Sequence, residues 1–171
     1  MRYWPYALSA LIVLLDRATK HVIESTFSTW DTVRVIPGFF QIVSARNTGM
    51  AFSLFDNSGE GRTSPLLVAF TIAVLGGVAW LLWQSVRNSG AESEHGHWSF
   101  RLALGLILGG AAGNLYDRLM FGSVTDFLDF YWGSAHFPVF NLADSAITCG
   151  AIVVMLNLWL VRPRVGSEPR P

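Results

Sequence analysis

The stretch PLLVAFTIAVLGGVAWLLW at Pro65–Trp83 decides the fold class, because it contains no charged residue. A helix needs about 20 predominantly apolar residues to cross a bilayer core of roughly 30 Å, and this run is close to that length. Across all 171 residues, 51% are hydrophobic and only 14% are charged. Soluble domains carry about 25% charged residues. The composition excludes a disordered chain, argues against a soluble globular domain and predicts an integral membrane protein.

Three further apolar runs resemble this one in length and composition: Tyr3–Leu15, Leu102–Tyr116 and Ser145–Val161. The first run could be read as a secretory signal peptide, but it lacks a small-residue cleavage site and we interpret it as a retained span. The sequence therefore predicts an all-α membrane protein with four transmembrane helices, folded as a single integral membrane domain over residues 1–171. The predicted spans cover residues 3–22, 65–84, 100–117 and 143–162.

The distribution of basic residues predicts the orientation of these spans, since short cytoplasmic loops are rich in Lys and Arg. One side of the predicted topology carries six arginines, namely Arg2, Arg87, Arg101, Arg162, Arg164 and Arg170. The short loop between the third and fourth spans has Arg118 as its only base. We therefore expect both termini to be cytoplasmic. Four carboxylates would then gather at the outer membrane surface: Asp16, Asp117, Asp126 and Asp144.

Asp126 and Asp144 are the candidate catalytic pair. Two carboxylates held close together cannot both ionise, so they share a proton. The ionised group can then accept a proton from water while the protonated one donates to a carbonyl oxygen, which is general acid–base hydrolysis. The alternative is that both acids merely mark the ends of spans in the headgroup region.

Other polar residues stand at helical spacing from these acids. Asn141 lies three residues before Asp144 and is either a helix cap or a group that orients this acid. Asn114 lies three residues before Asp117 and four before Arg118, so it shares a helix face with each of them. Either Asn114 and Arg118 line the same polar pocket, where Arg118 can pair with Asp117, or Asp117 and Arg118 are an ion pair at the membrane interface.

Two further elements precede the second span in the sequence. Asp16 and Lys20 are spaced to pair along a helix, so they either neutralise each other or support a polar pocket. Asn47 and Gly49 belong to a short segment in which the glycine would let the backbone approach a ligand, although a plain turn is the simpler reading.

The long connection after the first span is predicted to contain a small β-structure. Thr32–Ile36 and Phe39–Ser44 are rich in β-branched and aromatic residues, and Pro37-Gly38 between them is a turn signal. We expect an extracytoplasmic β-hairpin or platform over about residues 30–55, followed by a surface helix around Phe52–Phe55.

In the third span, Gly105, Gly109 and Gly113 predict close packing against a neighbouring helix. The Gly76-Gly77 pair in the second span could face these glycines.

The sequence provides no signal for a cofactor or a metal site. Cys149 is the only cysteine, and His95 and His97 lie in a loop expected on the cytoplasmic side. The 12 basic and 12 acidic residues balance, which argues against nucleic acid as a partner. We therefore expect neither a cofactor nor a nucleic acid partner.

Four sequence blocks resemble those of the bacterial lipoprotein signal peptidase family, also called signal peptidase II. They are DRATK at residues 16–20, NTGMAFS at 47–53, GNLYDRLMFGSVTDF at 113–127 and FNLADSA at 140–146. Their order and their positions among four predicted spans match the family over nearly the whole chain.

The resemblance implies an aspartic endopeptidase of the bacterial inner membrane, with its active site at the outer leaflet. The substrate would be a prolipoprotein whose lipobox cysteine carries diacylglycerol, cut just before that cysteine. By motif position, the catalytic dyad is Asp126 and Asp144.

The resemblance also assigns roles to the remaining motif residues. Those expected around the substrate are Asn47, Gly49, Asn114, Arg118 and Asn141, and those expected to support the site are Asp16, Lys20 and Asp117. The outer hairpin resembles the family's cradle on the membrane lipid, and the peptide antibiotic globomycin is expected to bind. We expect the chain to act as a monomer.

Two other function classes remain open on the sequence alone. A transporter or proton-conducting protein would use intramembrane ionisable residues as a relay, with acids distributed across the depth of the membrane. A membrane scaffold would have no catalytic need for Asp126 or Asp144.

Overall fold

The computed structural model describes residues 2–28, 31–49, 63–87 and 94–160. Within these ranges the chain forms four helices and four strands. In order they are α1 (Trp4–Thr26), β1 (Thr32–Ile36), β2 (Phe40–Asn47), α2 (Pro65–Arg87), α3 (Glu94–Phe121), β3 (Val124–Trp132), β4 (Ala135–His136) and α4 (Leu142–Leu160). The surface helix predicted around Phe52–Phe55 lies outside the described residues.

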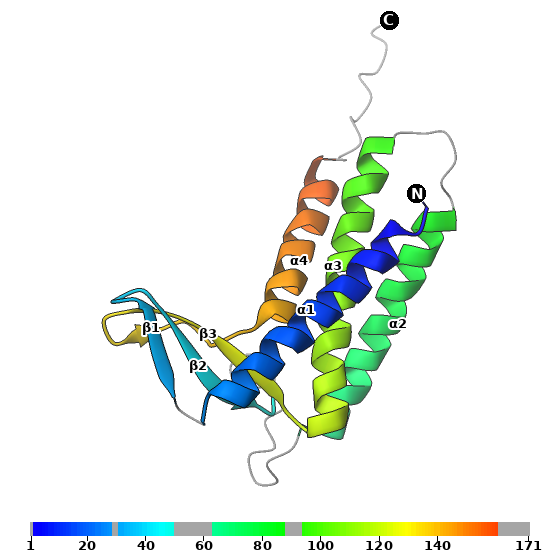
Figure 1. Cartoon of the computed structure of the whole chain (residues 1–171). Coiled ribbons are helices and arrows are strands. Elements are labelled where there is room, and N and C mark those ends of the chain that lie inside the picture. Colours follow the sequence, from blue (N-terminus) through cyan, green and yellow to red (C-terminus); the bar gives the residue numbers. More distant parts are fainter. Residues whose placement is uncertain (1, 29–30, 50–62, 88–93, 161–171) are drawn as a thin grey trace, which may run out of the picture.

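The four helices run side by side as one bundle, and the sheet lies at the end of the bundle away from the N-terminus (Figure 1). α3 packs against each of α1, α2 and α4. Its glycines permit this approach, since a Cβ at Gly105 would lie 2.9 Å from the carbonyl oxygen of Pro5 in α1. The suggestion that Gly76 and Gly77 face these glycines is wrong, because a Cβ at either position would meet nothing within 4 Å.

The outer surface of the bundle is apolar. Among the described residues, two helices are long and apolar enough to cross a membrane, namely α2 and the Leu142–Trp159 part of α4, and few of their side chains are buried. Large exposed apolar side chains include Phe70, Trp80 and Leu158. α1 and α3 contain charged residues toward the sheet end, and their crossing of the membrane stays a prediction.

The sheet is larger than the predicted hairpin. β1 and β2 form the expected antiparallel hairpin, but β3 adds to β2 and β4 adds to β3, giving the order β1-β2-β3-β4. The structure is therefore not all-α. Where the structure has β3, the sequence predicted only a connection between the third and fourth spans that includes Asp126. Asp126 and Asp129 are both buried, at 3% exposure each, so the strand has polar groups where a core strand has apolar ones.

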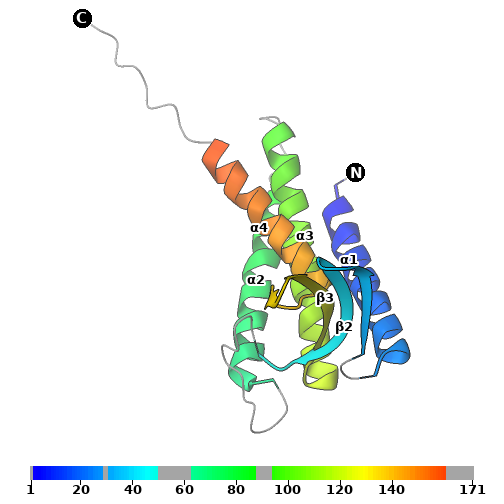
Figure 2. The same cartoon turned by 90° about the vertical axis from the view of Figure 1, so that its left-hand side faces the viewer.

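The sheet lies against the ends of α1 and α3, as seen in a view turned by 90° (Figure 2). Gly122 directs the chain from α3 into β3 with a φ of 74°, a left-handed conformation that suits the residue after a helix. β3 then bonds to the segment that enters α4, because the amides of Phe127 and Leu128 both donate to the carbonyl oxygen of Phe140. These bonds place the start of α4 beside the middle of β3.

Candidate active site

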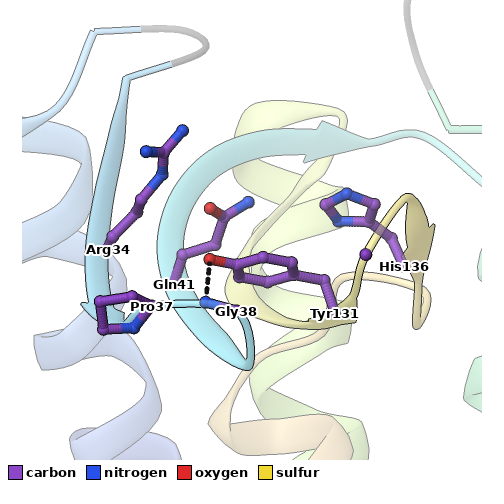
Figure 3. Close-up of a pocket in the computed structure, with 7 residues that line it drawn as sticks. Arg34, Pro37, Gly38, Gln41, Tyr131 and His136 are labelled. Carbon is purple, nitrogen blue, oxygen red and sulfur yellow. Dashed lines mark hydrogen bonds between the residues drawn. The ribbon is translucent and has the colours of Figure 1, made fainter.

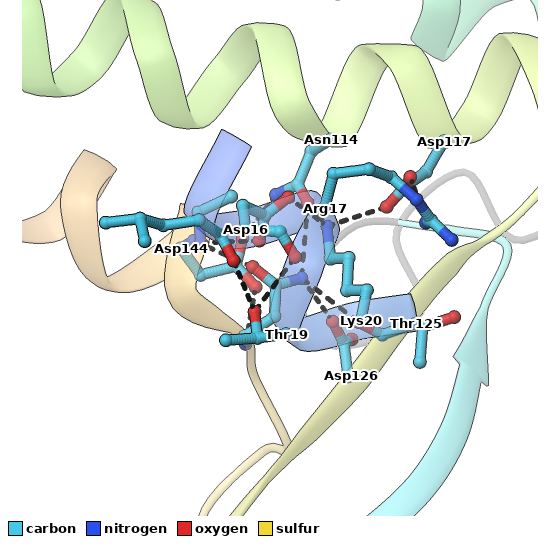
Figure 4. Close-up of polar contacts among 12 residues, drawn as sticks. Asp16, Arg17, Thr19, Lys20, Asn114, Asp117, Thr125, Asp126 and Asp144 are labelled. Atoms are coloured by element: carbon cyan, nitrogen blue, oxygen red, sulfur yellow. Dashed lines mark hydrogen bonds and ion pairs between the residues drawn. The ribbon is translucent and has the colours of Figure 1, made fainter. Parts of the chain in front are cut away.

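Hydrogen bonds and ion pairs join all ten residues singled out in the sequence into one cluster where the helix bundle meets the sheet. Figure 4 shows six of them, Asp16, Lys20, Asn114, Asp117, Asp126 and Asp144. They come from five parts of the chain: the second half of α1, the end of β2 with the turn after it, the last two turns of α3, β3 and the start of α4. The spacing along the chain predicted several of the local pairs, whereas the fold alone brings the five segments together.

The start of α4 holds both candidate catalytic acids through Asn141. The Asn141 side-chain oxygen accepts from the amide of Asp144 at 2.9 Å, and the Asn141 amide is 3.2 Å from a carboxylate oxygen of Asp144. This reciprocal pair is a helix capping arrangement. The side-chain nitrogen of Asn141 also donates to Asp126 at 2.7 Å. Asn141 is therefore both a cap and the direct link between the two acids.

Asparagine amides bond both carboxylate oxygens of Asp126. Asn141 donates to one, and Asn47 at the end of β2 donates to the other at 2.9 Å. Burial, and after it the nearby charge of Asp144, raise the pKa of the Asp126 carboxyl to about 7, against the lowering effect of the two amides. Asp126 can therefore hold a proton near neutral pH.

Asn114 connects the candidate dyad to a buried lysine. Its side-chain nitrogen donates to Asp144 at 2.7 Å, and its side-chain oxygen accepts from Lys20 at 2.8 Å. The same oxygen also accepts from the side-chain nitrogen of Asn141 at 3.2 Å. Since every partner fixes the orientation of the Asn114 amide, its nitrogen is directed at Asp144.

Lys20 is fully buried and its ammonium group has three acceptors. They are Asp16 at 2.7 Å, Asp117 at 2.7 Å and Asn114 at 2.8 Å. An ammonium group has three protons to donate, so this lysine is satisfied. The other oxygen of Asp16 accepts from the amide of Ala143 at the start of α4. The pairing predicted for Asp16 and Lys20 is present, and it anchors α1 to α3 and α4.

Arg118 and Asp117 do not pair as the sequence suggested. Asp117 contacts Lys20 and Arg17 instead. Arg118 donates to the carbonyl oxygen of Gly49 at 2.9 Å and to that of Asn114 at 3.3 Å. Successive residues on a helix point in different directions, and here Asp117 faces α1 while Arg118 faces the turn after β2. Arg118 thus fixes the backbone turn that Asn47 begins.

A second chain of polar contacts was missed in the sequence. Arg17 bonds to both Asp117 and Glu24, and Glu24 accepts from the hydroxyl of Thr125 at 2.8 Å. Thr125 directly precedes Asp126, so these contacts tie β3 to α1 beside the candidate dyad. The spacing of Arg17 and Glu24, two helical turns apart, was the available signal.

Metal ligation finds no support among the described residues, where no group of three or more His, Cys, Asp or Glu side chains could hold an ion. The side chains of His95 and His97 lie outside this description. The side chains of the ten-residue cluster are carboxylates, carboxamides and cations that bond to each other.

Comparison with known proteins identifies the family. The family model described as signal peptidase (SPase) II matches residues 8–160. A lipoprotein signal peptidase from Solibacter usitatus is 45% identical over 165 residues, covering 96% of this chain and 94% of that protein. One from Maridesulfovibrio salexigens is 39% identical over 153 residues, covering 89% of this chain and 92% of that protein.

Solved structures agree with the sequence relatives. One bacterial membrane enzyme, determined by the in meso method at 2.3 Å resolution, has a TM-score of 0.75 and 25% identity, covering 98% of this chain and 94% of that one. A second, at 1.9 Å resolution, has a TM-score of 0.70 and 28% identity, with 92% and 94% covered. The match over nearly the full length, in sequence and in fold, shows that this chain belongs to the signal peptidase II family of peptidases.

Proposed function

We propose that the chain is an aspartic endopeptidase that removes the signal peptide from diacylglyceryl-modified prolipoproteins by cutting before the lipidated cysteine. Family membership supports the lipoprotein substrate class. The single observation that carries the aspartic mechanism is that Asn141 donates to both acids, from its side-chain nitrogen to Asp126 and from its backbone amide to the carboxylate of Asp144.

The proposed reaction uses one proton shared by the two acids. Asp144 accepts a proton from water as the water oxygen bonds to the scissile carbonyl carbon, and Asp126 donates its proton to the carbonyl oxygen. The resulting diol then collapses. The carbon–nitrogen bond breaks, the departing cysteine nitrogen takes the proton from Asp144, and Asp126 recovers its proton from the diol. The pKa of about 7 for Asp126 supports its role as the protonated partner.

The neutral amides around the dyad suit a reaction in which one acid is ionised and the other is protonated. Asn47, Asn114 and Asn141 orient the acids without adding a charge that would hold both of them ionised. Gly49 and Arg118 form the adjoining turn, where we place the backbone of the substrate. The buried side chains that support the site without contacting the substrate are, in this proposal, Asp16, Lys20 and Asp117.

The apolar exterior of the bundle supports insertion in a membrane. We infer that all four helices cross the inner membrane, with both termini in the cytoplasm and the sheet with the dyad at the outer leaflet. The buried charges gather at one end of the bundle, which favours surface hydrolysis over a transport path across the membrane. Diacylglycerol on the substrate would keep the scissile bond at this depth.

The deciding experiment measures cleavage of a diacylglyceryl-modified prolipoprotein by the purified protein in lipid. Asp126→Asn and Asp144→Asn are each expected to lower the rate by about a thousandfold, because each removes one proton-transfer group. Asp31→Asn is the matched control, since Asp31 is exposed and lies before β1, away from the cluster. Globomycin should block the wild-type reaction, and EDTA should not.

Three results would overturn the proposal. Cleavage by both dyad variants at the wild-type rate would rule out the aspartic mechanism. Sensitivity of the wild type to EDTA would replace it with a metal-dependent one. Failure of the folded wild type to cut a modified substrate would leave transport or scaffolding as the function to test.

A further inference from the structure

We propose that a pocket at the far end of the sheet binds the phosphate of a membrane phospholipid headgroup. The pocket lies against the turn between β1 and β2 and the turn between β3 and β4 (Figure 3). The inference rests on the proposed placement of the sheet at the outer leaflet. It does not depend on peptide cleavage, so the two proposals can fail separately.

The pocket is built by all four strands and has a volume of about 320 Å³. Arg34 comes from β1, Gln41 from β2, Tyr131 from β3 and His136 from β4. This volume is at the lower end of the range for small-molecule sites, which suits a headgroup rather than a whole lipid. Tyr131 is five residues along β3 from Asp126, about 16 Å at the strand rise, so the pocket is separate from the candidate dyad.

The walls of the pocket are fixed by two contacts of Tyr131. Its hydroxyl oxygen accepts from the amide of Gly38 at 3.0 Å, which leaves the hydroxyl proton available to a ligand. Its ring stacks on the His136 ring, with centroids 5.3 Å apart. Gly38 has a φ of 81°, a conformation that favours glycine in the turn that closes this end of the pocket.

The pocket presents donors and positive charge. Arg34 supplies a guanidinium group, and the ring of His136 is held in place because its Nδ1 lies 2.9 Å from a carboxylate oxygen of Asp129. Asp129 is only 3% exposed, and its carboxylate accepts from Gln41 and lies beside His136. Among the described residues that line the pocket, none is acidic. The guanidinium group of Arg34 and the hydroxyl group of Tyr131 suit the negative charge and the acceptor oxygens of a phosphate.

Exposed apolar side chains lie next to both turns at this end of the sheet, which favours a lipid phosphate over a soluble one. Ile36 and Phe39 flank the β1–β2 turn, and Trp132 and Phe137 flank β4. All four are exposed, Trp132 at 80%. Aromatic side chains beside basic groups are typical of positions at the level of lipid headgroups. A lipid whose headgroup is bound in the pocket would have its glycerol and acyl chains at this apolar end of the sheet.

The test is native mass spectrometry of the full-length protein in neutral detergent, titrated with phosphatidylglycerol. Arg34→Gln is expected to weaken binding of the first lipid about tenfold, as expected for loss of a charge-assisted hydrogen bond. Tyr131→Phe should weaken it less. Arg46→Gln, which removes an exposed arginine at the other end of β2, is the matched control and should bind like the wild type. Asp126→Asn should also bind normally.

Two parallel titrations identify the ligand. Diacylglycerol with the same acyl chains lacks the phosphate, so its binding should not respond to Arg34→Gln. Inorganic phosphate should not displace phosphatidylglycerol at equal concentration. Equal loss of binding in Arg34→Gln and Arg46→Gln, or no loss in either, would overturn the pocket. Displacement by inorganic phosphate would overturn the lipid as its ligand.

Discussion

Two pairs of aspartates in this molecule are buried within one polar cluster but have different partners. Asp16 and Asp117 share the ammonium group of Lys20, at 2.7 Å each. Asp126 and Asp144 are held mainly by asparagine amides. A cation fixes a carboxylate in its charged form, whereas an amide orients the group and lets it exchange a proton. The first pair is suited to a structural role and the second to chemistry.

Removal of the cation should produce the largest effect on stability. Lys20→Met leaves Asp16 and Asp117 buried without their shared partner, which we expect to lower the free energy of unfolding by about 3–5 kcal/mol. Arg17 still contacts Asp117, so that aspartate keeps one partner. The measurement is unfolding of the purified protein in one detergent, followed by tryptophan fluorescence.

Two variants in the same assay show whether the pairs differ as argued. Arg46→Met removes an exposed cation and should change stability by less than about 0.5 kcal/mol. Asp126→Asn should abolish cleavage without a comparable loss of stability. A dyad variant as unstable as Lys20→Met would mean that both pairs are structural.

The sequence predicted the pairing of Asp16 with Lys20 and offered a helix cap as one of two roles for Asn141, because each depends on spacing within one helix. It also located the β1–β2 hairpin, which has its own turn signal. The membrane class followed from composition alone. All of these features are local, and local patterns can be read without knowing the fold.

The features that were missed depend on contacts between distant segments. β3 carries Asp126 and Asp129 facing buried partners, so its pattern resembled that of a loop. Asp117 pairs with α1 rather than with Arg118, its neighbour in the sequence. Glu24 and Thr125 meet only because β3 packs on α1. No spacing rule within one segment predicts such contacts.

The pH dependence of cleavage tests the proton-holding member of the dyad. Burial and the charge of Asp144 raise the pKa of Asp126 to about 7, so the proton is present below that pH and lost above it. We expect kcat/KM to fall about tenfold per pH unit above pH 7. Initial rates between pH 5 and pH 9 provide the measurement. A rate that rises through pH 7 would show that the reaction needs a different protonation state.

A change at Asn47 should shift the pH at which kcat/KM begins to fall, without removing either acid. Its amide donates to Asp126 at 2.9 Å and favours the ionised form. Asn47→Ala should therefore raise the pKa of Asp126 and shift the falling limb to higher pH. An unchanged limb in this variant, with cleavage still measurable, would assign the titration to another group.

The smallest expected effect perturbs the structural pair without changing any charge. A Cβ at Gly113 would lie 2.8 Å from a carboxylate oxygen of Asp16, which Lys20 and the amide of Ala143 hold in place. Gly113→Ala must therefore displace Asp16 or spread α1 from α3. Gly77→Ala is the matched control, because it adds the same methyl group to a helix where nothing lies within 4 Å.

Helix propensity favours alanine equally at both positions, so the difference between the two variants isolates the contact with Asp16. We expect Gly113→Ala to be less stable than Gly77→Ala by about 1–3 kcal/mol in unfolding measurements. The folded fraction should keep kcat within a few-fold of the wild type, since Asp126 and Asp144 retain their amides. A large fall in kcat with unchanged stability would show instead that Asp16 positions Asp144 through the start of α4, and the two pairs would then act as one catalytic unit.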